Sequence, residues 1–119
     1  MTNDIRVIAC NIAISDSVFS PGALCYVVNG NPGWGGETSI EVYGRSRSGR
    51  WVRKWIRTRR LFNFRLKQVP PETFRYKYLK DYAWGTGYDD VQIRTWVDQF
   101  ERFGHEQRER NGLQIEERK

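Results

Sequence analysis

Apolar residues recur along the first part of the chain with the two-residue period of β-strands. Segments rich in Val, Ile, Trp, Phe and Tyr are separated by turns that contain Gly, Pro or Ser. The pattern predicts strands over residues 6–14, 23–28, 39–44, 51–58 and 61–69. Pro70 and Pro71 end the last segment, because proline cannot donate a hydrogen bond to a strand ladder.

Residues 51–58 match both strand and helix spacing. In a strand, rings and cations alternate along one face, which carries Trp51, Arg53, Trp55 and Arg57. The content of Trp, Val, Ile and Thr favours a strand, and the Gly-containing turn at 45–50 lets that strand return antiparallel. The pattern leaves open whether Trp51 and Trp55 face the core or solvent.

The segment 61–69 has a simpler alternation. Its apolar face, which we expect to be core, consists of Phe62, Phe64 and Leu66. The opposite, solvated face is expected to carry Leu61, Asn63, Arg65 and Lys67. We therefore exclude the three apolar side chains from any binding surface.

A helix is predicted over residues 89–103, with Asp89 or Asp90 as its N-cap. Its apolar stripe has helical spacing and comprises Ile93, Trp96, Val97, Phe100 and Phe103. Gly104 is expected to end the helix. The polar residues 105–119 are expected to form a mobile tail or a frayed helix extension.

These elements predict an α+β fold, in which a small, strongly bent antiparallel sheet of four or five strands precedes a C-terminal amphipathic helix. Residues 1–104 are expected to form one domain. Segment 72–82 fits a short helix or a strand, and we favour the helix.

The stretch PGALCYVVNGNPGWGGETSIEV, at 21–42, resembles the strand–loop–strand opening of SH3-like barrels. That resemblance implies an SH3-like barrel architecture and nothing about activity.

Positive charge is concentrated in one stretch, residues 42–71. It holds 10 of the 20 Lys and Arg residues and no Asp or Glu, so its formal charge is +10, whereas the whole chain carries +6. The flanking regions therefore carry a small negative excess. Trp and Phe are interleaved with the basic residues. A local basic segment of this kind favours a polyanionic partner.

Chemistry-bearing residues are scarce elsewhere. The single histidine, His105, lies in the predicted tail, and Asp89 and Asp90 are explained by helix capping, so we expect no catalysis, no metal and no cofactor. Cys10 and Cys25 follow apolar residues, which favours buried thiols in a reducing, cytoplasmic compartment over a disulfide. The apolar run at 5–14 is too short to span a membrane.

Nucleic-acid binding is the function that the basic stretch favours. Lys and Arg neutralise phosphates and Trp stacks on unpaired bases, so the expected ligand is single-stranded RNA or DNA. The candidate contact residues are Arg45, Arg47, Arg50, Trp51, Arg53, Trp55, Arg57, Arg59, Arg60 and Trp34. The alternative is a protein-interaction or assembly module that docks the same face and the Trp34 loop on an acidic protein.

Overall fold

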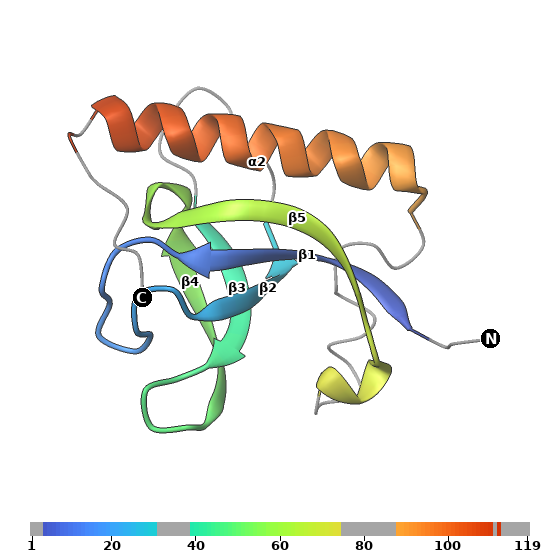
Figure 1. The fold of residues 1–119 in the computed structure, drawn as a ribbon, viewed down its shortest axis with the longest axis horizontal. Coiled ribbons are helices and arrows are strands. Elements are labelled where there is room, and N and C mark those ends of the chain that lie inside the picture. The colour runs from blue at the N-terminus through green and yellow to red at the C-terminus, as the bar shows by residue number, and fades with distance from the viewer. Residues whose placement is uncertain (1–3, 31–38, 75–87, 111, 113–119) are drawn as a thin grey trace.

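One antiparallel sheet and one long helix that crosses it form the described part of the chain (Figure 1). The computed structural model describes residues 4–30, 39–74, 88–110 and 112. The predicted α+β class is confirmed. In chain order the elements are β1 (Ile5–Ile12), β2 (Leu24–Asn29), β3 (Ser39–Arg45), β4 (Trp51–Arg57), the 3-10 turn η1 (Thr58–Arg60), β5 (Leu61–Val69), the 3-10 turn η2 (Pro71–Thr73) and α2 (Asp90–Arg110).

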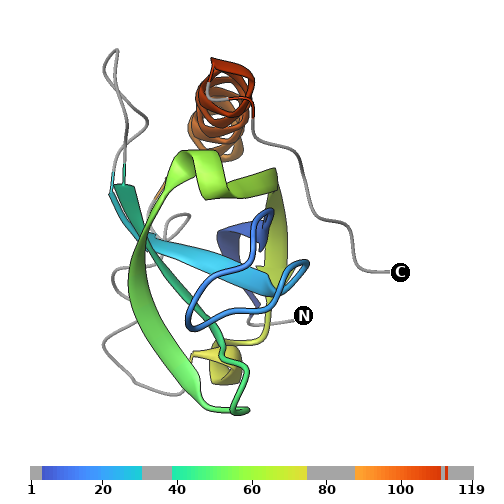
Figure 2. The same cartoon turned by 90° about the vertical axis from the view of Figure 1, so that its left-hand side faces the viewer.

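The strands follow the order β4-β3-β2-β1-β5, and every neighbouring pair is antiparallel. Strands β4 and β5 are the two edges of this sheet, so the sheet is open and the predicted SH3-like barrel is not confirmed. Figure 2 shows that the sheet curls strongly and that α2 lies across one end of the curl. The chain passes from β4 through η1 directly into β5, and α2 packs against both η1 and β5.

Both faces of the sheet bury apolar residues. One cluster lies between the sheet and α2 and includes Ile8, Val42, Ile56, Ile93 and Phe100. The second lies on the opposite face and consists of Val7, Ala9, Tyr26, Val28, Tyr43, Val69 and Phe74, with Trp51 packed against it. Four successive residues of β2, Cys25–Val28, are buried, as expected for a central strand covered on both faces.

A β-bulge in β5 changes which side chains reach the core. Asn63 has φ of 60°, and the register shifts there, because Ala9 pairs with Arg65 but Asn11 pairs with Phe62. The extra residue moves Leu61 onto the core face, where it is fully buried, while Phe62 is only half-buried. The predicted strict alternation is therefore wrong for Leu61 and Phe62 and right for Phe64 and Leu66, which contribute to the core.

The helix α2 begins as predicted and ends later. Asp89 caps it, since its Oδ1 accepts a hydrogen bond from Gln92 N at 2.8 Å. The helix continues through Gly104 to Arg110, so the predicted end at Gly104 is wrong. A Cβ on Gly104 would lie 3.0 Å from Thr58 O, so this glycine allows the helix to approach η1 closely.

Polar side chains anchor the last turns of α2 to the sheet. Thr58 Oγ1 donates to Gln107 Oε1 at 2.9 Å, and the buried Arg108 donates to Leu61 O. Glu101 accepts from Phe64 N at 3.0 Å and also pairs with Arg108. Of the two expectations for the segment after Gly104, a mobile tail or a helix extension, the structure shows the helix extension for residues 105–110. The ambiguous segment 72–82 begins with η2, and its residues after Phe74 lie outside the described part.

Candidate binding surface on strand β4 and its hairpin

The predicted strand in the basic stretch is confirmed, and its two faces differ sharply. Ile56 is 4% exposed and Val52 packs against the core under α2, whereas Trp55 on the other face is 52% exposed. The outer face also presents Arg53 and Arg57. Because β4 pairs with β3 along its whole length, from Arg45↔Trp51 to Ser39↔Arg57, these side chains stand on a fixed backbone.

The two tryptophans of β4 have different surroundings, although they share a face. Trp51 stacks on Tyr43, with ring centroids 5.0 Å apart and planes 25° apart, and also on Tyr26 at 6.5 Å. It belongs to the second apolar cluster and is half-buried. Trp55 lies opposite Glu41 in the register and is exposed. Trp51 is thus partly core, and Trp55 is a surface ring.

Arginine and glutamate flank the exposed ring. Arg53 Nε lies 3.6 Å from Glu41 Oε2, so part of the positive charge beside Trp55 is balanced. Arg57 is exposed at the end of the strand, and Arg59 is half-buried in η1. The outer face of β4 from Arg53 to Arg57 is therefore cationic overall, and one carboxylate, Glu41 of the neighbouring strand β3, lies beside it.

A loop before β2 binds several cations of the basic stretch. Asp16 accepts hydrogen bonds from Lys54 Nζ at 2.7 and 2.9 Å, from Val18 N at 2.6 Å and from Phe19 N at 3.2 Å. Burial alone would raise the pKa of Asp16, but the hydrogen bond from Lys54 and those from the two backbone N–H groups outweigh it and lower the pKa. The carboxylate is therefore a structural acceptor.

Two predicted contact residues also hold this loop. Arg47 Nη2 donates to Ser15 Oγ at 2.7 Å and to Asp16 O at 3.0 Å, and Arg60 Nη2 donates to Ser15 O at 2.6 Å. The backbone of the hairpin joins in, because Arg47 N donates to Val18 O at 2.9 Å. Sequence reasoning missed Asp16, because nothing in the sequence distinguishes it from the other three acids that precede the basic stretch.

The other predicted residues lie at the hairpin tip or outside the described part. Arg45 is exposed and reaches across the turn, where its Nε donates to Gly49 O at 3.3 Å. Arg50 is exposed beside it. The structure thus places Arg45, Arg47, Arg50 and Trp51 at one end of β4, and Trp55, Arg57 and Arg59 at the other. Trp34 lies outside the described residues.

Two hollows flank the hairpin tip and share Ser46 and Arg47 as a wall. The larger, about 400 Å³, is lined by Ser20, Ala23, Leu24, Arg45, Ser46, Arg47 and Trp51. The smaller, about 320 Å³, is lined by Ser17, Val18, Ser46, Arg47, Ser48, Arg50 and Val52. Ser20, Ala23 and Leu24 carry no charge or motif, so sequence reasoning gave no reason to select them.

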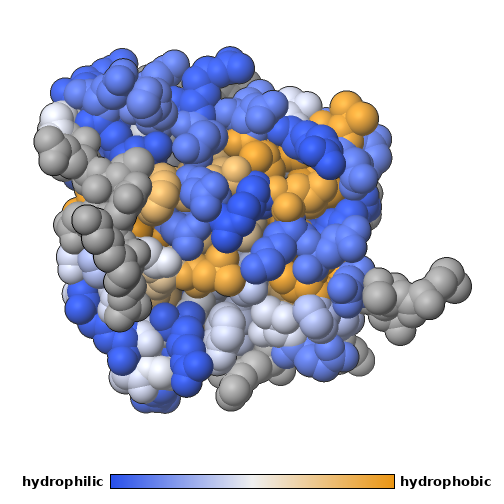
Figure 3. Space-filling view, viewed as in Figure 1, coloured by the Kyte–Doolittle hydropathy of each residue, from blue (hydrophilic) through white to orange (hydrophobic). Residues whose placement is uncertain are grey.

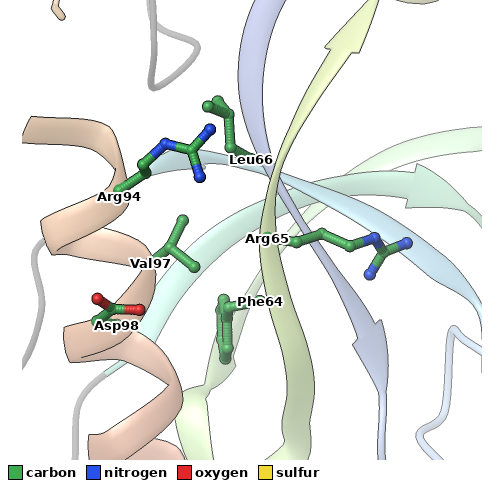
Figure 4. A pocket seen from close by; sticks show the side chains of 6 residues that line it. All are labelled: Phe64, Arg65, Leu66, Arg94, Val97 and Asp98. Carbon is green, nitrogen blue, oxygen red and sulfur yellow. The ribbon is translucent and has the colours of Figure 1, made fainter. Parts of the chain in front are cut away.

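A third hollow, of about 360 Å³, lies between α2 and β5. Figure 4 shows Leu66, Phe64 and Val97 between the two elements, while Arg65 points away from the helix. Arg65 Nη1 donates to Asn11 Oδ1 at 2.8 Å and so helps to fix the bulge. Apolar surface is visible along this side of the molecule, crossed by polar side chains (Figure 3). The charged residues that line the hollow are Arg65 from β5 and Arg94 and Asp98 from α2.

The two cysteines face each other across β1 and β2, where Cys10 pairs with Cys25 in the register. Both are buried free thiols. Burial raises the pKa of Cys25 to about 12, and burial followed by the neighbouring Cys25 raises the pKa of Cys10 well above its ordinary value. Thiols in this state are poor nucleophiles and poor metal ligands.

Among the described residues, no group of His, Cys, Asp and Glu is placed to hold a metal ion. Within the same part of the chain, α2 is too polar to cross a membrane and no other helix qualifies. Comparisons with protein-family models, with curated proteins and with solved structures found no match to this chain.

Proposed function

We propose that the chain binds single-stranded nucleic acid through the outer face of β4, with Trp55 as a base-stacking platform between Arg53 and Arg57. The observation that carries the proposal is the exposure of Trp55, at 52%, on a strand whose backbone is fixed by pairing. A ring flanked by cations is the arrangement that binds unpaired bases and their phosphates without regard to sequence.

The charge distribution supports a ligand that carries many phosphates. Arg53, Arg57, Arg45 and Arg50 are all exposed and follow β4 and its hairpin from one end to the other. Each phosphate that they neutralise releases counterions, which makes affinity depend steeply on salt. Duplex DNA is disfavoured as the main ligand, because its bases are stacked on each other and cannot reach Trp55.

The first test is a salt titration of binding to a fluorescently labelled single strand, measured by polarisation. Changing Arg53 and Arg57 to Glu is expected to weaken binding. It should also reduce the magnitude of the slope of log affinity against log salt concentration by about 2, because each arginine is expected to neutralise one phosphate. The matched control reverses Arg94 and Arg102, which are exposed on α2, and changes the net charge by the same amount. The proposal would be refuted by an affinity that changes neither with salt concentration nor on replacing Arg53 and Arg57 by Glu.

The second test removes the platform. Trp55→Ala is expected to weaken binding by about 1–3 kcal/mol, or roughly 5- to 150-fold, because one base loses its stacking partner. Tyr88→Ala is the control, since Tyr88 is also exposed, at 48%, but lies beside Arg6 of β1. Equal affinities for the Trp55 variant and the unmodified chain would remove Trp55 from the site.

A protein partner at the same face is a second candidate function, and Glu41 is the observation that favours it. This carboxylate lies opposite Trp55 and pairs with Arg53, so it would repel a phosphate but could accept hydrogen bonds from a protein of mixed charge. Exposed Trp and Arg are also frequent hot spots of protein interfaces. Pull-down with and without nuclease separates the two, because only a protein partner survives nuclease.

The unbridged, facing thiols lead us to propose a reducing compartment, the cytoplasm, for either function.

A further inference from the structure

The hollow beside Trp51 is built differently from the exposed surface around Trp55. Its lining combines an aromatic wall, Trp51, with apolar Ala23 and Leu24 and with the hydroxyl and guanidinium groups of Ser20, Ser46, Arg45 and Arg47. At about 400 Å³ it falls within the size range of pockets that hold small ligands. Trp55, by contrast, offers a single open ring.

The aromatic wall is fixed in place before any ligand arrives. Tyr43, which is fully buried, stacks on Trp51 at 5.0 Å, and Tyr26 stacks on it at 6.5 Å. The Trp51 ring therefore has little freedom to fold into the hollow. A ring held in this way loses little entropy when a flat ligand stacks on it.

The two arginines that line the hollow also make hydrogen bonds within the protein. Arg47 donates to Ser15 Oγ at 2.7 Å and to Asp16 O at 3.0 Å, and Arg45 donates to Gly49 O at 3.3 Å. The bond of Arg45 uses Nε, so the terminal nitrogens of this exposed side chain can still donate to a ligand. Ser20 and Ser46 add hydroxyl groups that can donate or accept.

We propose that this hollow, the Trp51 pocket, takes one nucleotide of the bound strand, with the base against Trp51 and its phosphate on Arg45. A flat ring, hydrogen-bonding edges and an anion in one ligand match the aromatic wall, the hydroxyl groups and the arginines that line the hollow. This inference rests on the proposed function. Trp51 and Trp55 are four residues apart on one strand, about 13 Å, so a strand a few nucleotides long reaches both.

The test fills the pocket without touching Trp51. Ser20→Phe places a ring in the hollow and leaves intact the hydrogen bond that the Ser20 backbone carbonyl accepts from Ala23 N. Affinity for labelled oligothymidylate is expected to fall about tenfold, and chemical-shift changes of the Trp51 indole N–H on titration with uridine monophosphate are expected to disappear. Asp98→Phe, which adds the same ring at the hollow between α2 and β5, is the matched control and is expected to change neither.

The outcomes separate this inference from the function beneath it. If oligothymidylate binds, Trp55→Ala weakens it and Ser20→Phe does not, the Trp51 pocket is wrong and the proposed function stands. If the unmodified chain binds no oligonucleotide, the proposed function fails, and absence of a shift at Trp51 with uridine monophosphate then refutes the pocket as well. Should Ser20→Phe not fold, Arg45→Gln serves instead, and it is expected to reduce the chemical-shift change of the Trp51 indole N–H on titration with uridine monophosphate. An unchanged shift in that variant would refute the pocket.

Discussion

The basic stretch contains two sets of residues, one bonded to a neighbouring loop and one exposed on the sheet surface. Lys54, Arg47 and Arg60 reach the loop at Ser15 and Asp16 and hold it against the sheet. Arg53, Trp55 and Arg57 stand on the outer face of β4 and are exposed. Both sets lie within residues 42–71, and neighbours in sequence such as Lys54 and Trp55 belong to different sets because side chains alternate along a strand.

The difference shows that a count of charges overstates the charge that a partner can meet. A formal +10 in the sequence includes cations whose hydrogen bonds are already made to one loop. Removing a cation of the first set should lower stability, and removing one of the second should lower affinity. Four measurements test that division, beginning with the largest expected effect.

Asp16→Ala is expected to lower the free energy of unfolding by about 3 kcal/mol. The change leaves Lys54 Nζ and the N–H groups of Val18 and Phe19 without their acceptor. Urea denaturation measures the loss. Asp98→Ala is the control, because Asp98 is exposed on α2, and it is expected to stay within about 0.5 kcal/mol of the unmodified chain. Equal midpoints for the two variants would contradict the structural role of Asp16.

Trp51→Ala and Trp55→Ala are expected to have unequal effects on stability. Trp51 loses its stacking on Tyr43 and Tyr26 and leaves a gap in the second apolar cluster, at a cost of about 2 kcal/mol for a half-buried ring. Trp55 is 52% exposed, so its removal should cost about 0.5 kcal/mol or less. Thermal melts of the two variants measure the contrast. Similar losses would mean that the two rings do not differ in burial.

Arg60→Met is expected to destabilise the chain by about 1 kcal/mol, because Ser15 O loses a charged donor at 2.6 Å. Arg50→Met is the matched change, since Arg50 is exposed at the hairpin tip, and it should leave stability within about 0.5 kcal/mol. Urea midpoints compare the pair. The reverse ranking would assign Arg60 to the binding surface and Arg50 to the fold.

The smallest effect concerns pH. Lys54 and two backbone N–H groups lower the pKa of Asp16 in the folded chain, so the folded state binds fewer protons than the unfolded state near that pKa. The stability that Asp16 contributes is therefore present above its unfolded pKa, about 3.9, and is lost as pH falls through the folded pKa. Denaturation at pH 5 and at pH 3 should show a drop that is smaller in Asp16→Asn. An identical drop in both chains would exclude Asp16 as its source.

The elements followed from the sequence wherever a local pattern determined them. The period-two segments predicted the start of all five strands to within a residue, and Asp89 gave the start of α2. The end of α2 was missed because Gly104 can either terminate a helix or let it approach another segment. Only the position of Thr58 O beside Gly104 distinguishes the two roles. The exchange of Leu61 and Phe62 between the faces of β5 was missed for a related reason, because an Asn such as Asn63 does not by itself indicate a bulge.

The candidate binding surface was predictable in composition but not in arrangement. Sequence spacing placed Arg53, Trp55 and Arg57 on one face, and the structure does the same. The spacing could not show that Trp51, on that same face, stacks on Tyr43 and Tyr26, because those rings come from β3 and β2. Nor could the spacing show that Lys54 forms an ion pair with Asp16, because the two residues are far apart in the chain.

The position of β4 at the edge of the sheet has a consequence for solubility. An edge strand presents unpaired N–H and C=O groups that could pair with the same edge of another copy of the chain, and closely spaced cations are a common defence against such pairing. Arg53, Lys54 and Arg57 lie on this edge strand. Pairing of two copies along this edge would bring these cations close to one another, so the arginines that we assign to phosphates also disfavour such pairing.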